Sequence, residues 1–403
     1  MDLLRNRLKF NFSYLIYIYL FVYFIVNILF LVDFPFIHSD EAWLSGLSRA
    51  MAESGSMSVT EPFFDSFARN PHGIKLIFHL IQIVFLKVFG YKIFTFRLIS
   101  LLFSIGCLYV FYSLVELIFK SNKVSLLATI ILSMDLHYIY SSHLGRQEII
   151  ILFFILFNLY YLFSGLDNHS YYRDILIGIS TGISIGIHPN SFIVALAIGG
   201  VYFFMVVAKK ISYKNLLLLI LIVSIFALIF IGISLSMDKN FIGNYRESGR
   251  QFGVEQGFSE KLLKVRDFYR NIYEGKSVTY YIPNIKFILF LFPIFFIFSI
   301  LLSFNSDNGQ LIRATGVGLI FILLGITLIG RYNVTSIIFI FPFIYILISY
   351  SLIAFYKNRK AYLLLLLLVI TLLNTVTNIK TYSNNYNDYL NELSNNVEKG
   401  AKV

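Results

Sequence analysis

The stretch FSYLIYIYLFVYFIVNILFLV (residues 12–32), together with FIHSDEAWLSGLSRAMAESG (residues 36–55), decides the fold. The first segment is an apolar run of about 21 residues, which is long enough to cross a bilayer as a helix. The second is amphipathic and opens with two adjacent carboxylates, Asp40 and Glu41. We therefore predict a first membrane-spanning helix and, directly after it, a polar segment at the membrane surface.

The rest of the chain is equally apolar. Of its 403 residues, 58% are hydrophobic and only 14% are charged, far from the composition of a soluble domain. Because lipid leaves every backbone polar group to be satisfied internally, we predict an all-α polytopic membrane protein. About eleven spans are expected from the apolar runs. They cover residues 12–32, 94–119, 124–141, 149–166, 174–187, 190–208, 214–236, 285–304, 311–330, 333–356 and 361–378.

The net charge of +11 does not indicate nucleic-acid binding, because the Lys and Arg residues fall mostly in short loops, where they set topology. The single cysteine, Cys107, excludes an internal disulfide and argues against a cysteine metal cluster. Arg5, Arg7 and Lys9 precede the first apolar run, and no small-residue cleavage site follows it. We expect an uncleaved first span with a cytoplasmic N-terminus, in a protein of the plasma membrane.

Residues 1–378 form one transmembrane domain in this interpretation, and residues 379–403 form a polar tail. Two connections are long, residues 33–93 and 237–284. Within the first, Lys75, His79 and Gln82 share one face of a 72–90 helix, spaced i, i+4, i+7. A charge at the bilayer centre costs about 2.5–3.5 kcal/mol, so we expect an interfacial helix here. The alternative is a short span whose polar stripe faces other helices.

If residues 72–90 do not cross, the short basic loops become cytoplasmic and both long connections become external. Four polar groups then meet on the external side. They are His38 with Asp40 and Glu41, the turn Asn70 to Lys75, the segment His143 to Glu148, and the segment Gly330 to Asn333. A carboxylate can deprotonate a hydroxyl, and arginines can hold a phosphate. This set of groups suits a sugar attached to a lipid phosphate at the membrane surface.

The order of the motifs resembles the GT-C superfamily of polyprenyl-phosphate-sugar glycosyltransferases. The closest patterns are those of the protein O-mannosyltransferases and the aminoarabinose lipid A transferases. The motifs are DEAWLSGLSRAMAESG (40–55), a proline turn before the 72–90 helix, RLIS (97–100), SSHLGRQE (141–148) and GRY (330–332). The match extends over about residues 1–200 and beyond that rests on Arg331 and Tyr332.

The resemblance implies a GT-C-like bundle and inverting transfer of a hexosyl or pentosyl group at the external face, as part of cell-envelope, protein or lipid glycosylation. The donor would be a dolichyl or undecaprenyl phosphate sugar within the membrane lipid. The acceptor would be a hydroxyl of a glycan, lipid or protein. The catalytic candidates are Asp40, its partner Glu41, and the second acidic residue, Glu148. No cofactor is required, although the three carboxylates could bind a divalent metal.

The residues that would hold the donor phosphate are less sharply indicated. Arg331 matches an arginine that serves the phosphate in the family. The family turn often reads Lys-Pro-Pro or His-Pro-Pro, whereas this chain has Asn70-Pro71-His72. We therefore add Arg146, Lys75 and Arg69 as phosphate ligands. The expected substrate contacts are His72, Tyr332 and His143.

Each candidate also has a structural interpretation. Ser39 or Asp40 would cap the helix, and Glu41 would suit the helix dipole in its first turn. Arg146 and Glu148 would form an ion pair between spans. Arg146 and Arg331 would anchor helix ends, and His38 and His143 would fill hydrogen-bonded positions. Three further features are expected to be structural: Arg97 at a cytoplasmic helix start, a turn at His188-Pro189, and a close-packing stripe of Gly178, Gly182 and Gly186.

Two other functions remain open from the sequence. A lipid-linked sugar flippase or transporter would also be polytopic and basic inside, but it would place ionisable residues at the midplane and show internal repeats. A polysaccharide polymerase would share the external arginines, with less reason for Asp-Glu after the first span. The 237–284 loop, which carries several Arg and Tyr residues, either covers the substrate or is a solvated connection.

Overall fold

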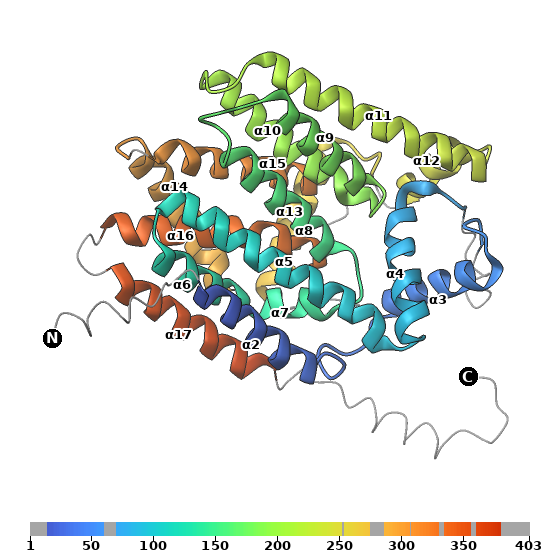
Figure 1. The fold of residues 1–403 in the computed structure, drawn as a ribbon, viewed down its shortest axis with the longest axis horizontal. Coiled ribbons are helices and arrows are strands. Elements are labelled where there is room, and N and C mark those ends of the chain that lie inside the picture. The colour runs from blue at the N-terminus through green and yellow to red at the C-terminus, as the bar shows by residue number, and fades with distance from the viewer. Residues whose placement is uncertain are drawn as a thin grey trace, which may run out of the picture.

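The computed structural model describes residues 14–59, 70–251, 254–274, 286–306, 308–329, 334–355 and 360–379. Within those ranges the chain is a bundle of helices and contains no strand (Figure 1). The all-α prediction is confirmed. The predicted tail, apart from Ile379, lies outside the described residues.

Every predicted apolar run contains a helix. The helices that correspond to single runs are α2 (Leu15–Leu29), α5 (Ile93–Phe119), α8 (Glu148–Phe163), α9 (Tyr171–Ile185), α10 (Phe192–Val207), α11 (Tyr213–Met237), α14 (Lys286–Ser303), α15 (Gly309–Ile329), α16 (Phe341–Phe355) and α17 (Lys360–Ile379). Within the described ranges six helical segments are long and apolar enough to cross a membrane, and a bent pair makes seven. The chain is therefore an integral membrane protein. The predicted count of eleven spans is not established, because α2, α8 and α14 are short and α9, with 15 residues, is not among the candidate spans either.

The run predicted as one span at residues 124–141 is broken. It forms α6 (Asn122–Ser133) and α7 (Leu136–His143), which meet at an angle of 67°. Asp135 causes a new helix to start, because its Oδ1 accepts hydrogen bonds from the backbone N–H groups of His137 and Tyr138 at 2.8 and 3.2 Å. Its Oδ2 accepts a hydrogen bond from the Tyr345 hydroxyl, with 2.7 Å between the two oxygens. Both oxygens of this buried carboxylate therefore have hydrogen-bond partners. The bend brings the end of α7 to the site described below.

The centre of the bundle is α5, which packs against α2, α6 and α8. Helices α9 and α11 lie unusually close together. A Cβ atom on Gly178, Gly182 or Gly186 would come within 2.9, 2.4 and 2.5 Å of side chains of α11, namely Ile222, Phe226 and Phe230. The predicted close-packing role of this stripe is confirmed.

The first long connection contains α3 (Ser39–Ser54), a short 3₁₀ turn η3 (Gly73–Lys75) and α4 (Leu76–Phe89). The polar face of α4 meets α3: the Ser48 hydroxyl donates to Gln82 Oε1 at 2.6 Å and lies 2.9 Å from His79 Nδ1. The opposite face exposes Leu80, Val84 and Val88. At 14 residues, α4 is only about 21 Å long, too short for a bilayer core of about 30 Å.

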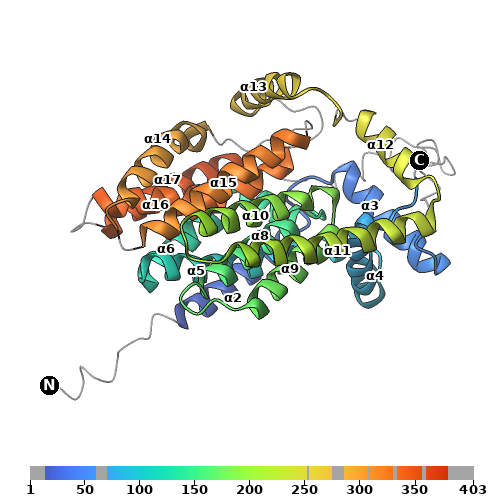
Figure 2. The same ribbon diagram turned by 90° about the horizontal axis from the view of Figure 1, so that it is seen from above.

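Helix α4 lies at one end of the bundle and runs across the direction of the long helices in both Figure 1 and Figure 2. Its exposed apolar face and its orientation favour the interfacial interpretation. The polar stripe nevertheless faces a helix, as the alternative required, and that helix is α3 of the same connection.

The second long connection, where described, is also helical. It contains α12 (Phe241–Gln251) and α13 (Phe258–Glu274). Helix α12 lies at the same end as α3 and α4 (Figure 2). The end of α11 is tied to the first connection by the Gly73 N–H, which donates to Ser234 Oγ at 2.8 Å. The first long connection and the start of the second therefore lie at the same end of the bundle (Figure 2).

Candidate active site

Helix α3 begins with a capping box made by His38. The Nδ1 atom of His38 accepts from the Asp40 backbone N–H at 3.0 Å, and the His38 N–H donates to Glu41 Oε2 at 3.0 Å. The N-cap is therefore His38, not Ser39 or Asp40 as one interpretation of the sequence held.

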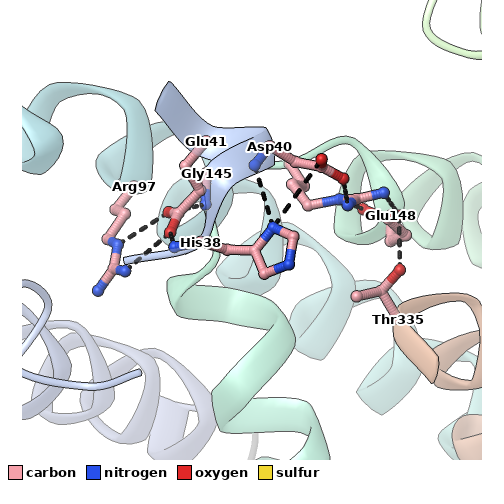
Figure 3. Close-up of polar contacts among 8 residues, drawn as sticks. His38, Asp40, Glu41, Arg97, Gly145, Glu148 and Thr335 are labelled. Carbon is pink, nitrogen blue, oxygen red and sulfur yellow. Dashed lines mark hydrogen bonds and ion pairs between the residues drawn. The ribbon is translucent and has the colours of Figure 1, made fainter. Parts of the chain in front are cut away.

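Glu41 points into the protein and is 1% exposed. Its Oε1 accepts from Arg97 Nε at 2.9 Å and from the Gly145 N–H at 2.7 Å. Its Oε2 accepts from Arg97 Nη2 at 2.9 Å, in addition to the His38 N–H. With four hydrogen bonds on two oxygens, Glu41 holds three segments together (Figure 3).

Arg97 is the partner that makes this pairing rigid. It is fully buried, and its Nη1 donates to the carbonyl oxygens of Leu31 and Pro35 at 3.1 and 2.8 Å. Arg97 thus fastens the exit from α2 onto the start of α5. Its predicted structural role fits this geometry. Arg97 lies beside Glu41, so the two residues share one side of the bundle and cannot lie on opposite sides of the membrane, as predicted from the sequence.

Asp40 faces the other way. Its Oδ2 is paired with Arg146 Nη1. The same guanidinium donates through Nη2 and Nε to the two oxygens of Glu148, at 2.8 and 3.2 Å. The Thr335 hydroxyl, in the 3₁₀ segment η5 (Val334–Ile340) that precedes α16, donates to Glu148 Oε1 at 2.8 Å. Asp40 is therefore held by a chain of polar contacts that reaches across the bundle (Figure 3).

Exposure separates the three carboxylates. The side chain of Asp40 is 35% exposed, whereas Glu148 and Arg146 are only 3% and 6% exposed. Glu41 and Glu148 each face an arginine from inside the protein. Of the three predicted catalytic acids, Asp40 is the one that a substrate can reach from the surface without displacing a buried ion pair.

His143, a predicted substrate contact, lies in the core of the protein. His143 is fully buried, with Nδ1 3.0 Å from the Phe34 carbonyl oxygen and Nε2 2.9 Å from Asn27 Oδ1. The bend between α6 and α7 turns this histidine into the core, where it joins α7 to the end of α2. This geometry supports the interpretation of His143 as a buried, hydrogen-bonded structural residue.

Lys75 lies near the site, on η3. Its Nζ is 5.0 Å from the centre of the Trp43 ring, a cation–π contact with a residue one turn beyond Asp40 on α3. The neighbouring His72 ring packs against α12, with its centre 6.1 Å from that of Tyr245. The other predicted ligands, Arg69, Arg331 and Tyr332, lie outside the described residues.

Metal binding finds no support in the donor set that is described. Among the described residues, no three His, Cys, Asp or Glu side chains are grouped so that they could hold an ion. The Arg146 guanidinium stands between Asp40 and Glu148, and Arg97 and two backbone N–H groups take the oxygens of Glu41.

Sequence reasoning missed Thr335, Gly145 and the pairing of Glu41 with Arg97. These residues come from four different elements, so no local pattern links them. Gly145 offered one signal, because it directly precedes Arg146 in the polar segment His143 to Glu148. A Cβ atom on it would lie 3.1 Å from Glu41 Oε1, which crowds the carboxylate that its N–H binds.

The fold is shared with solved membrane enzymes. ArnT from Cupriavidus metallidurans, in a structure with bound undecaprenyl phosphate, matches with a TM-score of 0.63 and 13% identity, covering 90% of this chain and 63% of that one. The oligosaccharyltransferase of Archaeoglobus fulgidus, solved with Zn and sulfate, matches with a TM-score of 0.56 and 12% identity, covering 94% of this chain and 56% of the other.

The chain has a GT-C fold. It spans less than two thirds of the length of either solved relative. Residues 73–233 of the chain also match a family model, that of the dolichyl-phosphate-mannose-protein mannosyltransferases. That match begins after Asp40 and Glu41. Comparison with curated protein sequences finds no match.

Proposed function

We propose that this protein is a membrane glycosyltransferase that moves a sugar from a polyprenyl phosphate to an acceptor hydroxyl at the external membrane surface. The observation that carries the proposal is the Asp40 carboxylate, which is accessible yet held in place by buried Arg146 and Glu148. The GT-C fold and the mannosyltransferase family match support the reaction class. The ArnT structure contains undecaprenyl phosphate, which supports a lipid phosphate as the donor's leaving group.

In the proposed reaction, Asp40 takes the proton of the acceptor hydroxyl as that oxygen attacks the anomeric carbon. A bond forms between the acceptor oxygen and the anomeric carbon. The bond from that carbon to the phosphate oxygen breaks, and the polyprenyl phosphate leaves with the electron pair. Attack from the face opposite the phosphate inverts the anomeric centre.

Glu41 and Glu148 are positioning residues in this proposal. Glu41 fixes the start of α3 by binding Arg97, Gly145 and the His38 N–H. Glu148 fixes Arg146 by a two-point contact, and Arg146 in turn fixes Asp40. Neither glutamate needs to contact the reacting atoms.

Arg146 is a poor ligand for the donor phosphate, since Asp40 and Glu148 together give its surroundings more negative than positive charge. We assign the phosphate instead to Lys75. Its ammonium lies over the ring of Trp43, which is one turn beyond Asp40 on α3. Arg331 and Arg69 stay as proposed phosphate ligands, and His72 and Tyr332 as proposed substrate contacts. In this topology the site is extracytoplasmic, in the plasma membrane, with the N-terminus in the cytoplasm.

The test is transfer from radiolabelled polyprenyl-phosphate sugars in native membranes, which supply the unidentified acceptor. Wild type, Asp40→Asn and Lys75→Ala are compared at equal expression, with several donors. The matched controls are Glu53→Gln, an exposed carboxylate on the same helix, and Lys87→Ala, an exposed lysine at the end of α4. We expect Asp40→Asn to reduce kcat by about 10²–10⁴-fold, the usual contribution of a general base.

We expect Lys75→Ala to raise KM for the donor, while both controls transfer at the wild-type rate. Equal transfer by wild type and Asp40→Asn would remove Asp40 from the role of base. If no donor is used and labelled lipid instead changes leaflet, the protein is a flippase.

A further inference from the structure

An open pocket, which we call the tyrosine cavity, lies far from Asp40, toward the other end of α5. Its volume is about 450 Å³. Glu116, which lines it, is 19 positions beyond Arg97 on α5, or about 28 Å along the helix axis. The cavity is lined mainly by tyrosines of α5, α8 and the start of α2. The lining includes Tyr14, Tyr17, Tyr109, Tyr112, Tyr160 and Glu116.

The outer wall of this tyrosine cavity is an aromatic pair. The rings of Tyr17 and Tyr109 have centres 5.9 Å apart, and their hydroxyl oxygens are 3.5 Å apart. Both side chains are partly exposed, so a ligand can reach the wall from outside. Interfacial tyrosines are common at membrane surfaces, and that tendency alone would explain these two residues.

It does not explain Tyr112, which forms the inner wall. Tyr112 is only 4% exposed, and within the described part of the chain its hydroxyl has no hydrogen-bond partner. Buried hydroxyls are normally satisfied, because leaving one unpaired costs free energy. A ligand that donates a hydrogen bond inside the cavity would satisfy it.

Glu116 lies one turn after Tyr112 and is half-buried in the cavity lining. No cation among the described residues forms an ion pair with its carboxylate. A carboxylate in this position attracts positive charge and disfavours ligands whose only charge is negative. Tyrosine rings attract the same charge through their π faces.

We propose that the tyrosine cavity binds an alkylammonium group. The ammonium would form an ion pair with Glu116, donate a hydrogen bond to the Tyr112 hydroxyl oxygen, and lie against the rings of Tyr17 and Tyr109. An apolar ligand would leave both Tyr112 and Glu116 unsatisfied. The same chemistry is offered by the ethanolamine head group of a phospholipid and by a free small amine.

The test uses the purified full-length protein in detergent and measures thermal stabilisation against ligand concentration, which reports the Kd. The probes are ethylammonium chloride, a short-chain phosphatidylethanolamine and a short-chain phosphatidylglycerol, which has no ammonium. The variants are Glu116→Gln and Tyr112→Phe. Asp167→Asn, an exposed carboxylate in the loop after α8, is the matched control.

We expect phosphatidylethanolamine to stabilise the wild type and phosphatidylglycerol not to. Stabilisation by ethylammonium as well assigns the site to ammonium groups in general, and its absence assigns the site to the lipid. Glu116→Gln should weaken binding about tenfold or more, as expected for loss of an ion pair in a partly buried site. Tyr112→Phe should weaken binding without lowering the melting temperature of the unliganded protein, because its hydroxyl has no internal partner.

The proposal fails if neither ammonium probe stabilises the wild type, or if phosphatidylglycerol binds as well as phosphatidylethanolamine. It also fails if Glu116→Gln and Tyr112→Phe bind as tightly as Asp167→Asn. All three readouts are independent of transferase activity.

Discussion

At the scale of single residues, three carboxylates with the same chemistry have three different surroundings. Glu41 is buried against Arg97, Glu148 is buried against Arg146, and Asp40 is partly exposed while sharing Arg146. A buried carboxylate that already accepts several hydrogen bonds is a poor proton acceptor for a substrate, since its contacts would have to break. The surroundings therefore favour Asp40 as the base and Glu41 and Glu148 as positioning residues.

The first prediction concerns Glu41. Replacing it with Gln leaves the Arg97 guanidinium buried without its counter-charge, which should cost about 3–5 kcal/mol in the free energy of unfolding. Denaturant titration of purified protein measures this, with Glu53→Gln as the control. A catalytic role for Glu41 would instead show as lost kcat with unchanged stability, and that result would contradict the structural assignment.

The second prediction concerns Arg146. Lysine cannot bind both oxygens of Glu148 and still reach Asp40, so Arg146→Lys should misplace the Asp40 carboxylate. A displacement of about 1 Å can cost about 10²-fold in rate, and we expect a loss of that order in kcat with little change in donor KM. The control is Arg49→Lys. Arg49 is on the same helix as Asp40, and its guanidinium lies over the ring of Tyr91. A large rise in KM would point to phosphate binding by Arg146.

At the scale of elements, two departures from regular helix packing shape the molecule. The break between α6 and α7 turns His143 into the core and, with Leu144 and Gly145, leads the chain to Glu41. The glycine stripe of α9 lets α11 approach closely, and the end of α11 in turn holds η3 through Ser234. Both features position the site from a distance.

The third prediction belongs to this scale. Gly182→Ala should destabilise the protein by about 1–3 kcal/mol, because its Cβ would meet the Phe226 ring at 2.4 Å. Gly199→Ala in α10 is the matched control, since nothing lies within 4 Å of its Cβ position. Alanine favours a helix over glycine by about 1 kcal/mol, so the control should be neutral or stabilised. Equal melting temperatures for both variants would show that the close contact relaxes.

At the scale of the whole molecule, polarity is divided between the two ends of the bundle. The Asp40 site, α3, α4 and α12 gather at one end (Figure 2), while the tyrosine cavity and Asp167, which follows α8, lie toward the other. This arrangement fits a membrane protein with its site on one surface rather than at the midplane.

The fourth prediction tests that division by cysteine labelling. Cys107 is buried, so a maleimide should label an introduced surface cysteine without also labelling Cys107. In intact cells a membrane-impermeant maleimide should label Glu53→Cys, beyond Asp40 on α3. Asp167→Cys should be labelled only after permeabilisation. The reverse pattern would invert the topology and place Asp40 in the cytoplasm.

Much of the fold could be predicted because its causes are local. Apolar runs of sufficient length must form helices in lipid, whatever their neighbours. The i, i+4, i+8 glycines and the i, i+4, i+7 polar stripe of α4 follow from helical periodicity. Asp40 could be found for the same reason, because it opens an amphipathic segment eight residues after the end of an apolar run.

Only the tertiary structure decided which polar groups meet. Arg97 binds Glu41 across 56 positions of sequence, Arg146 binds Asp40 across 106, and Thr335 binds Glu148 across 187. The sequence by itself determined an all-α membrane protein with carboxylates at one surface, because hydropathy and helical period act within a few turns. The separation of one accessible acid from two buried ones depends on side-chain direction and long-range packing. No local pattern encodes either.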